Sequence, residues 1–212
     1  MDGSDARPDT DEARRRYRAL AAGYDRRIGL LDRLRRRLIS RAGFQTGDHV
    51  LDMGCGTGAS FAALREAVGA SGRVTGVELT EEMAAVARQR ISAAGWDNVE
   101  VTVGDATIAP LPTEVDGILF FLTHDLTRTP PVVQRAVAAG RPGATVVAFG
   151  PCRARGWGTP ANLIVRPIAR RYVTTLEGYD EPWSHLAAAV PGLRIRRPFL
   201  GATYVAVGKT RD

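Results

Sequence analysis

A short stretch with three glycines and one carboxylate is the part of the sequence best suited to bind a ligand. It reads LDMGCGTGAS and places Asp52 two residues before Gly54, with Gly56 and Gly58 following at alternate positions. Glycines let a ligand approach the backbone without meeting a β-carbon, and a helix that starts after them directs unpaired N–H groups toward the ligand. The stretch therefore predicts a site for a nucleotide-like molecule.

Two kinds of ligand fit this loop. Gly54, Gly56 and Ala59 match the G-x-G-x-x-G/A pattern of dinucleotide sites, and Glu78 follows about 20 residues later, where a carboxylate can accept from ribose hydroxyls. Asp52 favours another ligand, because a carboxylate aimed into the loop would repel a pyrophosphate and attract a cation. S-adenosylmethionine carries an ammonium and a sulfonium and no phosphate. The alternative is a dinucleotide-dependent oxidoreductase or a nucleotide-sensing module.

The elements around the loop predict an α/β fold. Short apolar runs alternate with helical windows from residue 49 onward, and this alternation implies a parallel sheet with helices on both faces. The expected strands span residues 49–53, 73–79, 99–103, 115–121 and 145–150, and the expected helices span 11–22, 28–41, 59–69, 80–94 and 131–139. Two final strand-like runs, 193–201 and 203–209, predict an antiparallel edge hairpin. We expect a Rossmann-like, open, mostly parallel sheet of seven strands.

The helix after the second strand has recognisable ends. Thr80 can cap its N-terminus, Glu81 and Glu82 favour the positive end of its dipole, and Gly95 stops it. Because ligands bind beyond the carboxyl ends of the strands in such a sheet, this helix start is expected to lie beside the glycine loop.

Length and composition indicate one domain over residues 1–212. The chain is 44% hydrophobic and 25% charged, which is ordinary globular usage. We expect residues 1–10 to be disordered. No apolar run approaches the roughly 20 residues that span a bilayer, and the N-terminus is polar, so a cytoplasmic location is expected. Cys55 and Cys152 have no spacing that indicates a disulfide or a zinc site, and we expect no metal.

Arginine carries the excess behind the formal charge of +6. Eleven arginines lie between Arg14 and Arg41, before the glycine loop, and a second group comprises Arg166, Arg170 and Arg171. We interpret them mainly as solvated helix faces, since helices with an apolar stripe need a polar opposite face. Anionic partners such as lipid are the alternative. Nucleic acid is not expected, because aromatic residues are not interleaved with the arginines.

Five ordered motifs carry a resemblance to a known family. Residues 50–58, VLDMGCGTG, closely resemble the glycine-rich motif of class I S-adenosylmethionine-dependent methyltransferases. The segments VTGVELTEEM, VTVGDAT, VDGILFFL and RPGATVVAFG resemble the family's second to fifth motifs, so the likeness covers roughly residues 40–150. The resemblance implies S-adenosylmethionine as the cofactor and S-adenosylhomocysteine as its product.

The resemblance also implies roles for individual residues in cofactor binding. Asp52 and the loop backbone would hold the methionine end, Glu78 the ribose hydroxyls, and Asp105 the adenine amino group. The full set of expected cofactor residues is Tyr17, Tyr24, Asp52, Gly54, Cys55, Gly56, Gly58, Glu78, Leu79, Met83, Gly104, Asp105, Ala106, Phe120 and Phe121. Each has a structural alternative; Glu78, for example, could only charge a helix N-terminus.

The acceptor side is expected to begin where the fourth strand ends. Thr123, His124 and Asp125 follow that strand directly, and a histidine there can accept a proton near neutral pH. His124 is thus a candidate base and acceptor contact, the alternative being that it only caps the next loop or bonds Asp125.

Two further segments are expected to complete the acceptor site. Residues 17–25, YRALAAGYD, resemble the lid of small quinone C-methyltransferases and bacterial phospholipid N-methyltransferases, so residues 11–42 would form a helical lid. In this lid Tyr24 and Tyr17 would close over the cofactor, and Tyr24 is a catalytic candidate beside His124. These tyrosines could instead pack as a pair. The Pro-interrupted residues 151–185 would form an acceptor-side insertion, with Trp157, Tyr179 and Trp183 as flat walls or as core filling.

The sequence as a whole predicts a methyltransferase. The expected acceptor is a small, largely apolar or aromatic molecule methylated at carbon or nitrogen, in specialised metabolism such as natural-product biosynthesis. The alternative is a phospholipid or quinone methyltransferase at an anionic membrane surface, to which the arginine-rich segments would be attracted. Exposed leucines near the N-terminus could support a homodimer.

Overall fold

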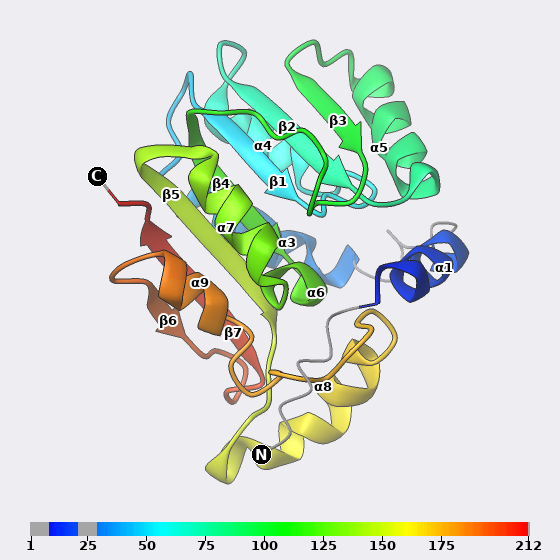
Figure 1. The fold of residues 1–212 in the computed structure, drawn as a ribbon, viewed down its shortest axis with the longest axis vertical. Coiled ribbons are helices and arrows are strands. Elements are labelled where there is room, and N and C mark those ends of the chain that lie inside the picture. The colour runs from blue at the N-terminus through cyan, green and yellow to red at the C-terminus, as the bar shows by residue number, and fades with distance from the viewer. Residues whose placement is uncertain (1–8, 21–28, 212) are drawn as a thin grey trace.

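The computed structural model describes residues 9–20 and 29–211, which form a central sheet with helices on both faces (Figure 1). The strand order is β3-β2-β1-β4-β5-β7-β6, and β7 alone runs opposite to its neighbours β5 and β6. The strands are β1 (His49–Met53), β2 (Arg73–Glu78), β3 (Val99–Val103), β4 (Val115–Phe121), β5 (Gly140–Pro151), β6 (Arg194–Arg196) and β7 (Thr203–Lys209). The predicted seven-stranded, mostly parallel sheet with an antiparallel hairpin is confirmed.

The helices cover the sheet in two groups. They are α1 (Thr10–Leu20), α3 (Asp32–Ser40), α4 (Phe61–Val68), α5 (Glu81–Ala94), α6 (His124–Thr127), α7 (Pro130–Ala138), α8 (Asn162–Ala169) and α9 (Ser184–Ala189), with 3-10 turns η1 (Gly29–Leu31) and η2 (Gly156–Ala161). Side chains of α7 and α9 pack in one core cluster, and those of α3, α4 and α5 in another. The short helix α6 was not expected from the sequence, because four residues give too little periodicity to detect.

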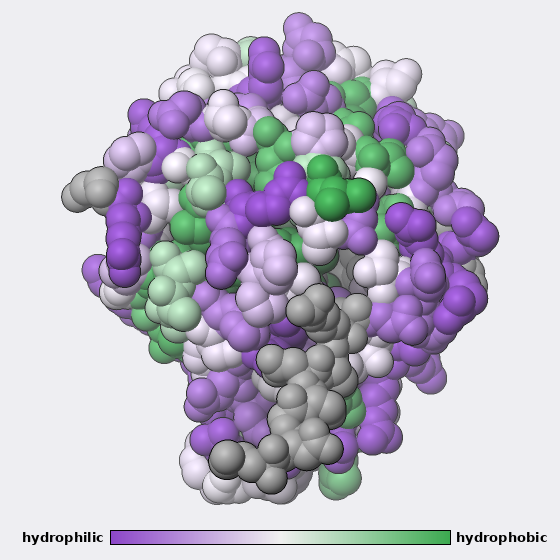
Figure 2. Space-filling view, viewed as in Figure 1, coloured by the Kyte–Doolittle hydropathy of each residue, from purple (hydrophilic) through white to green (hydrophobic). Residues whose placement is uncertain are grey.

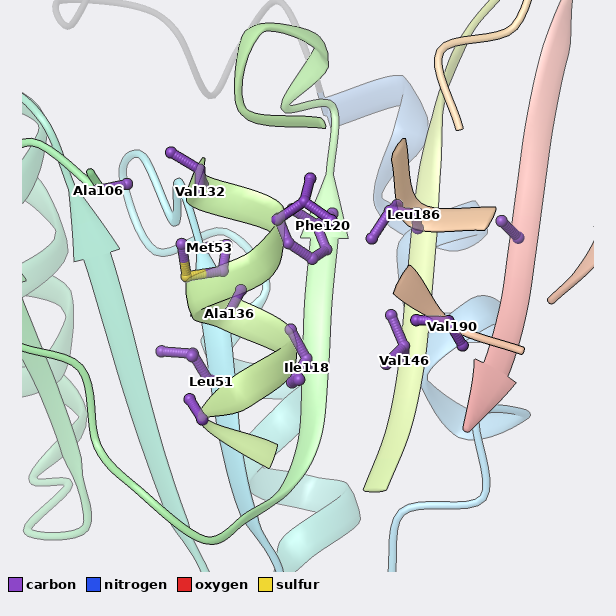
Figure 3. Packing of buried hydrophobic residues seen from close by; sticks show 14 of the residues in the cluster. Leu51, Met53, Ala106, Ile118, Phe120, Val132, Ala136, Val146, Leu186 and Val190 are labelled. Carbon is purple, nitrogen blue, oxygen red and sulfur yellow. The ribbon is translucent and has the colours of Figure 1, made fainter. Parts of the chain in front are cut away.

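Strand residues alternate between these two cores. In β4, Ile118 and Phe120 belong to the α7 and α9 side, whereas Leu119 belongs to the opposite side. Figure 3 shows Ile118 and Phe120 beside Val132 and Ala136 of α7. Both sheet faces are buried, which is why these strands read as continuous apolar runs.

The start of α5 differs in detail from the expectation. Thr80 does occupy the N-cap position, but its side chain makes no capping hydrogen bond. Its hydroxyl donates instead to Glu78 Oε1 at 2.9 Å. At the other end Gly95 ends the helix in the left-handed conformation, with φ 64°, as predicted.

The surface is largely polar. Figure 2 shows mostly hydrophilic residues on the viewed face, with hydrophobic residues in small groups among them. Among the described residues, no helix has the length and apolar character needed to cross a membrane.

The strand order places a ligand site. Strands run outward from β1 through β2 to β3 on one side and from β4 to β5 on the other, so the order reverses between β1 and β4. In open α/β sheets this reversal opens a crevice beyond the carboxyl ends of the strands.

Candidate active site

A cavity of about 310 Å³ lies at this reversal and is called the first cavity. Its wall comes from α1, the glycine loop, the carboxyl ends of β2, β3 and β4, and the start of α7. Ten of the residues expected to bind the cofactor line it: Tyr17, Gly54, Gly56, Glu78, Leu79, Met83, Gly104, Asp105, Ala106 and Phe121. Four strand ends that are far apart in the sequence thus converge on one space.

The glycine loop is held tightly against its neighbours. The N–H of Gly54 donates to the Val77 carbonyl at 2.8 Å, and the residue has a φ of +71°. A β-carbon added there would lie 2.7 Å from Cγ2 of Thr123, in the segment after β4. Gly54 is therefore required both by its backbone conformation and by the close approach of the two loops.

Glu78 ties the loop to the second strand. Its Oε2 accepts the Gly56 N–H at 3.0 Å, and its Oε1 accepts both the N–H and the hydroxyl of Thr80 at 2.9 Å. Burial raises the pKa of this carboxyl, while the bonds from Thr80 and Gly56 oppose the shift. Oε2, which accepts one bond, keeps a lone pair for a hydroxyl group of a ligand in the first cavity.

Asp105 terminates the third strand in a local turn. Its Oδ1 accepts the N–H of Thr107 at 2.8 Å and the Thr107 hydroxyl at 2.7 Å. These bonds fix the carboxylate in the wall of the first cavity. Asp105 therefore forms a turn and still lies where a ligand in the first cavity can contact it.

Asp52 lies beneath the glycine loop rather than in the cavity wall. The side chain is buried, with an exposed fraction of 1%, and its Oδ2 has no hydrogen-bond partner among the described residues. Burial raises the pKa of Asp52 to about 7, opposed by the positive charge of Arg35 and reinforced by Glu78. A buried carboxylate with an unsatisfied oxygen favours a positive charge above the loop.

Arg35 corrects one expectation from the sequence. It belongs to the arginine-rich segment interpreted as a solvated helix face, yet its exposed fraction is only 3%. The guanidinium lies 4.5 Å from the centroid of the Phe121 ring and forms an ion pair with Asp32. The sequence could not single it out, because its arginine neighbours on the same helix are exposed.

A second cavity, of about 470 Å³, adjoins the first. Its wall comes from η1, α3, α6, α8, the end of β5 and the turn between β6 and β7, and Leu122 lines both cavities. None of the described residues in this wall has a charged side chain at neutral pH. The polar side chains there are those of His124, Tyr172 and Thr203.

His124 lies in this wall in an unusual state. It is buried, and neither ring nitrogen has a hydrogen-bond partner among the described residues. Burial lowers the pKa of His124 to about 4, the charge of Arg128 adds to the shift, and the Glu177 backbone opposes it. This lowered pKa does not fit the expected base with a pKa near neutrality, because no carboxylate among the described residues pairs with an imidazolium at this position.

This depressed pKa predicts how stability depends on pH. The unfolded chain binds a proton near pH 6.5 that folded His124 does not take up until about pH 4, so this group destabilises the fold as the pH falls between those values. We expect wild type to lose about 2 kcal/mol more than His124→Gln between pH 8 and pH 5. Urea unfolding at both pH values measures this difference. Equal losses in the two proteins would contradict the depressed pKa.

Two neighbours of His124 lie elsewhere than expected. Thr123 and Asp125 line the first cavity, not the acceptor side. The Asp125 carboxylate accepts the N–H of Thr174 at 3.1 Å and so connects α6 to the segment after α8. His124 does not bond Asp125, because the two side chains point to different cavities.

The N-terminal helix closes one side of the first cavity. Tyr17 lines it, and its hydroxyl donates to the Tyr172 carbonyl at 2.7 Å. Arg18 of α1 pairs with Glu82 of α5 at 2.6 Å. Helix α1 thus contacts both α5 and Tyr172, which lies in the wall of the second cavity. Tyr24, the other expected lid residue, lies outside the described residues.

Several other expected site residues do not line either cavity. Phe120 is buried in the α7 core, and the side chain of Cys55 packs against Gly76. A β-carbon on Gly58 would meet Phe61 at 2.5 Å, so this glycine serves helix packing. None of these three residues contributes to the wall of the first or the second cavity.

The three aromatic residues expected to contact the acceptor lie in different environments. Trp183 packs in the core against Tyr204, with ring centroids 5.1 Å apart, and Trp157 is 83% exposed. Tyr179 is buried, and its ring lies edge-on to His124 at 5.8 Å. Only Tyr179 therefore contacts the acceptor side, as a support for His124.

The sequence missed a group of wall residues. Asp9, Thr10 and Ala13 contribute from the first turns of α1, and Thr129 and Pro130 contribute from the start of α7. The Thr-Pro pair before a helical window is a recognisable helix start, and it could have indicated that this end faces the strand termini.

Comparison with known proteins agrees with this geometry. Residues 50–143 match the family model described as "Methyltransferase domain". Demethylmenaquinone methyltransferase of Geobacillus stearothermophilus is 33% identical over 107 residues, covering 48% of this chain and 46% of that protein. The chain thus spans about half the length of the curated relatives it matches.

Solved structures share the fold at low identity. A SAM-dependent methyltransferase from Aquifex aeolicus aligns with a TM-score of 0.59 and 21% identity, covering 83% of this chain and 89% of that one. Geranyl diphosphate C-methyltransferase from Streptomyces coelicolor A3(2), in complex with Mg2+, geranyl diphosphate and S-adenosyl-L-homocysteine, aligns with a TM-score of 0.64 and 16% identity, covering 84% and 78%. The residues that match the family model, 50–143, contain the glycine loop and the carboxyl ends of β2, β3 and β4.

Proposed function

We propose that this chain uses its class I S-adenosylmethionine-dependent methyltransferase domain, which includes residues 50–143, to methylate a small, neutral, apolar acceptor. The family match, the relatives and the fold identify the domain and its cofactor, S-adenosylmethionine. One observation carries the proposal for the acceptor. A cavity of about 470 Å³, with no charged side chain among the described residues of its wall, meets the first cavity at Leu122, beside the end of β4.

The residues of the first cavity fit the cofactor. Its volume lies at the lower end of the range of ligand pockets, which begins at about 300 Å³. In the proposed complex Glu78 accepts from the ribose hydroxyls and Asp105 contacts the adenine. The unpartnered Oδ2 of Asp52 supports a cation over the glycine loop. Tyr17 and α1 cover the cofactor from the side.

Methyl transfer from a sulfonium requires the protein mainly to align the two reacting groups. S-adenosylmethionine supplies a methyl group whose bond to sulfur breaks, with the electron pair left on sulfur, as the acceptor atom forms its bond to carbon. The chain's residues have to align the acceptor and exclude water. Leu122, in both walls, separates the two spaces with an apolar side chain and is held in place by its N–H bond to the Phe149 carbonyl at 2.8 Å.

The second cavity limits the class of acceptor. A protonated amine or a phosphate would lose its hydration there without an ionic partner, and that loss costs several kcal/mol. The uncharged wall therefore favours a neutral molecule methylated at carbon over an amine methylated at nitrogen. The relative named demethylmenaquinone methyltransferase supports an apolar acceptor of the quinone type.

His124 takes the role of a positioning group in this proposal. Its imidazole is neutral at pH 7, and neither ring nitrogen has a partner among the described residues, a state that costs roughly 1–3 kcal/mol until a partner is supplied. A ring hydroxyl of the acceptor can supply that partner by donating to one nitrogen. The hydroxyl makes the ring carbon electron-rich. After the methyl group is attached, that carbon releases its own proton to a water molecule of the solvent.

The experiment is methyl transfer to a chosen set of acceptors. The protein is incubated with S-adenosylmethionine bearing a deuterated methyl group and, separately, a reduced prenylated naphthoquinone, a simple phenol, phosphoethanolamine and geranyl diphosphate. We expect mass spectrometry to detect the labelled methyl on the quinol or the phenol, at carbon. Labelling of phosphoethanolamine or geranyl diphosphate alone would overturn the proposed acceptor class.

A space-filling substitution tests the acceptor cavity separately. Val165 lines the second cavity and not the first, so Val165→Phe should reduce its volume. We expect at least about a tenfold higher KM for the acceptor, with the Kd of S-adenosylmethionine within twofold of wild type. The matched control is Val207→Phe, because Val207 is exposed on β7 and lines neither cavity. An unchanged KM in Val165→Phe would place the acceptor elsewhere.

A further inference from the structure

Exposed apolar side chains gather at one end of the molecule. Of the eight large hydrophobic residues that the structure exposes, six come from two segments, η2–α8 and the β6–β7 turn. They are Trp157, Leu163, Ile164, Ile168, Phe199 and Leu200. In Figure 1, η2 and α8 extend beyond the carboxyl end of β5 at one end of the long axis.

The two segments touch and form one surface. A β-carbon on Gly158 of η2 would lie 2.0 Å from the carbonyl oxygen of Leu200, and Arg197 donates hydrogen bonds to the carbonyls of Arg153 and Gly201. Ile168 and Phe199 both line the second cavity. We call the six apolar residues and the arginines between them the apolar rim, because two of the six lie at the edge of the second cavity.

The tip of the turn is held in an unfavourable conformation. Phe199 and Leu200 have φ values of 53° and 54°, in the left-handed region where glycine and asparagine are normally found. Bonds from the Gly201 N–H to the Pro198 carbonyl and from the Ala202 N–H to the Phe199 carbonyl close the turn. Bulky side chains there cost stability and stay 61% and 52% exposed, so core packing does not explain them.

The charge around the rim has one sign. Residues 151–171 and 194–201 contain eight arginines and no acidic residue. Arg153 and Arg155 lie near Asp180 and Glu181, but no described acidic residue lies within ion-pair distance of Arg166, Arg170 or Arg171, all exposed. Apolar side chains interspersed with unpaired arginines match an anionic bilayer, which offers acyl chains beneath a negative surface.

We infer that the apolar rim docks on the surface of an anionic phospholipid bilayer, with the side chains of α8 and the β6–β7 turn inserted at the level of the headgroups. The uncharged second cavity would then face the membrane, and an apolar acceptor dissolved in the bilayer could enter past Ile168 and Phe199. The proposal that the protein docks on a membrane depends only on the residues of the apolar rim. The delivery of an acceptor rests on the proposed function.

The test is sedimentation of the full chain with vesicles. The probes are vesicles of phosphatidylcholine and phosphatidylglycerol in equal parts, and vesicles of phosphatidylcholine alone, at physiological salt. We expect binding to the anionic vesicles and at least tenfold weaker binding by the double variant Leu163→Glu/Ile164→Glu. Arg166→Gln/Arg171→Gln should weaken binding about 25-fold, since each basic residue near an anionic surface contributes about fivefold.

A matched control separates docking from general surface stickiness. Ile108 is 81% exposed, about as much as Leu163 at 80%, but it follows β3 and lies outside the rim, so Ile108→Glu should bind the vesicles like wild type. No binding by wild type, or an equal loss in Ile108→Glu, overturns the proposal. A dimer that the double variant dissociates, without vesicle binding, would overturn it in favour of a second copy. Binding of S-adenosylmethionine and methylation of a detergent-dispersed acceptor read out the proposed function independently.

Discussion

Asp52→Asn is expected to raise the free energy of unfolding at pH 8 by about 2–4 kcal/mol. The carboxyl has a pKa of about 7 when folded, against 3.8 in the reference state, because burial disfavours its charge. An acid whose folded pKa is raised destabilises the fold progressively as the pH rises from about 4 to 7, and the full cost remains above pH 7. The amide has a similar shape and no charge to desolvate.

The same variant is expected to bind S-adenosylmethionine at least about tenfold more weakly. In the proposed complex the cationic methionine end lowers the pKa of Asp52, so binding to wild type near pH 6.5 should release a proton. Calorimetry in buffers of different ionisation enthalpy measures that release, and Asp52→Asn should abolish it.

Asp97→Asn is the control for both measurements, because Asp97 is an exposed carboxylate after α5. We expect it to change neither stability nor affinity by more than experimental scatter. If Asp52→Asn bound the cofactor like wild type and released the same proton, Asp52 would have no part in the site.

Glu78→Gln is expected to weaken binding of S-adenosylmethionine by about 100-fold or more. The carboxylate accepts the Gly56 N–H on one oxygen and the Thr80 N–H and hydroxyl on the other. A glutamine has only one oxygen, so its NH2 group must face one of these N–H donors and leave it unpaired. The glycine loop would lose its anchor at the same point where the ribose is proposed to bind.

The measurement for Glu78→Gln is titration calorimetry with S-adenosylmethionine, with circular dichroism to show that the variant folds. Glu81→Gln is the matched control. Glu81 is exposed at the start of α5, and among the contacts described it pairs only with Arg88. Affinity in that control should stay within twofold of wild type. Comparable affinities in the two variants would remove Glu78 from the cofactor site.

Much of the sheet could be predicted from the sequence. Strands 49–53, 99–103 and 115–121 have the expected bounds, because runs of β-branched and aromatic residues between turn residues are a local signal. The strand expected at 145–150 is longer, spanning residues 140–151, because Gly140 pairs with Val115 across a register shift that no local pattern encodes. Residues 151–185 gave little signal, since prolines interrupt their periodicity.

The sequence by itself determined the strand and helix alternation, the glycine loop and the carboxylates at the strand ends, because each is set by neighbouring residues. The tertiary structure decided which side chains reach a cavity: it buries Arg35 against Phe121, removes Trp157 from the acceptor side, and lowers the pKa of His124 to about 4. Burial and electrostatic environment depend on segments that meet only after folding, here α3, α6, α8 and the β6–β7 turn around one cavity whose described wall residues carry no charge.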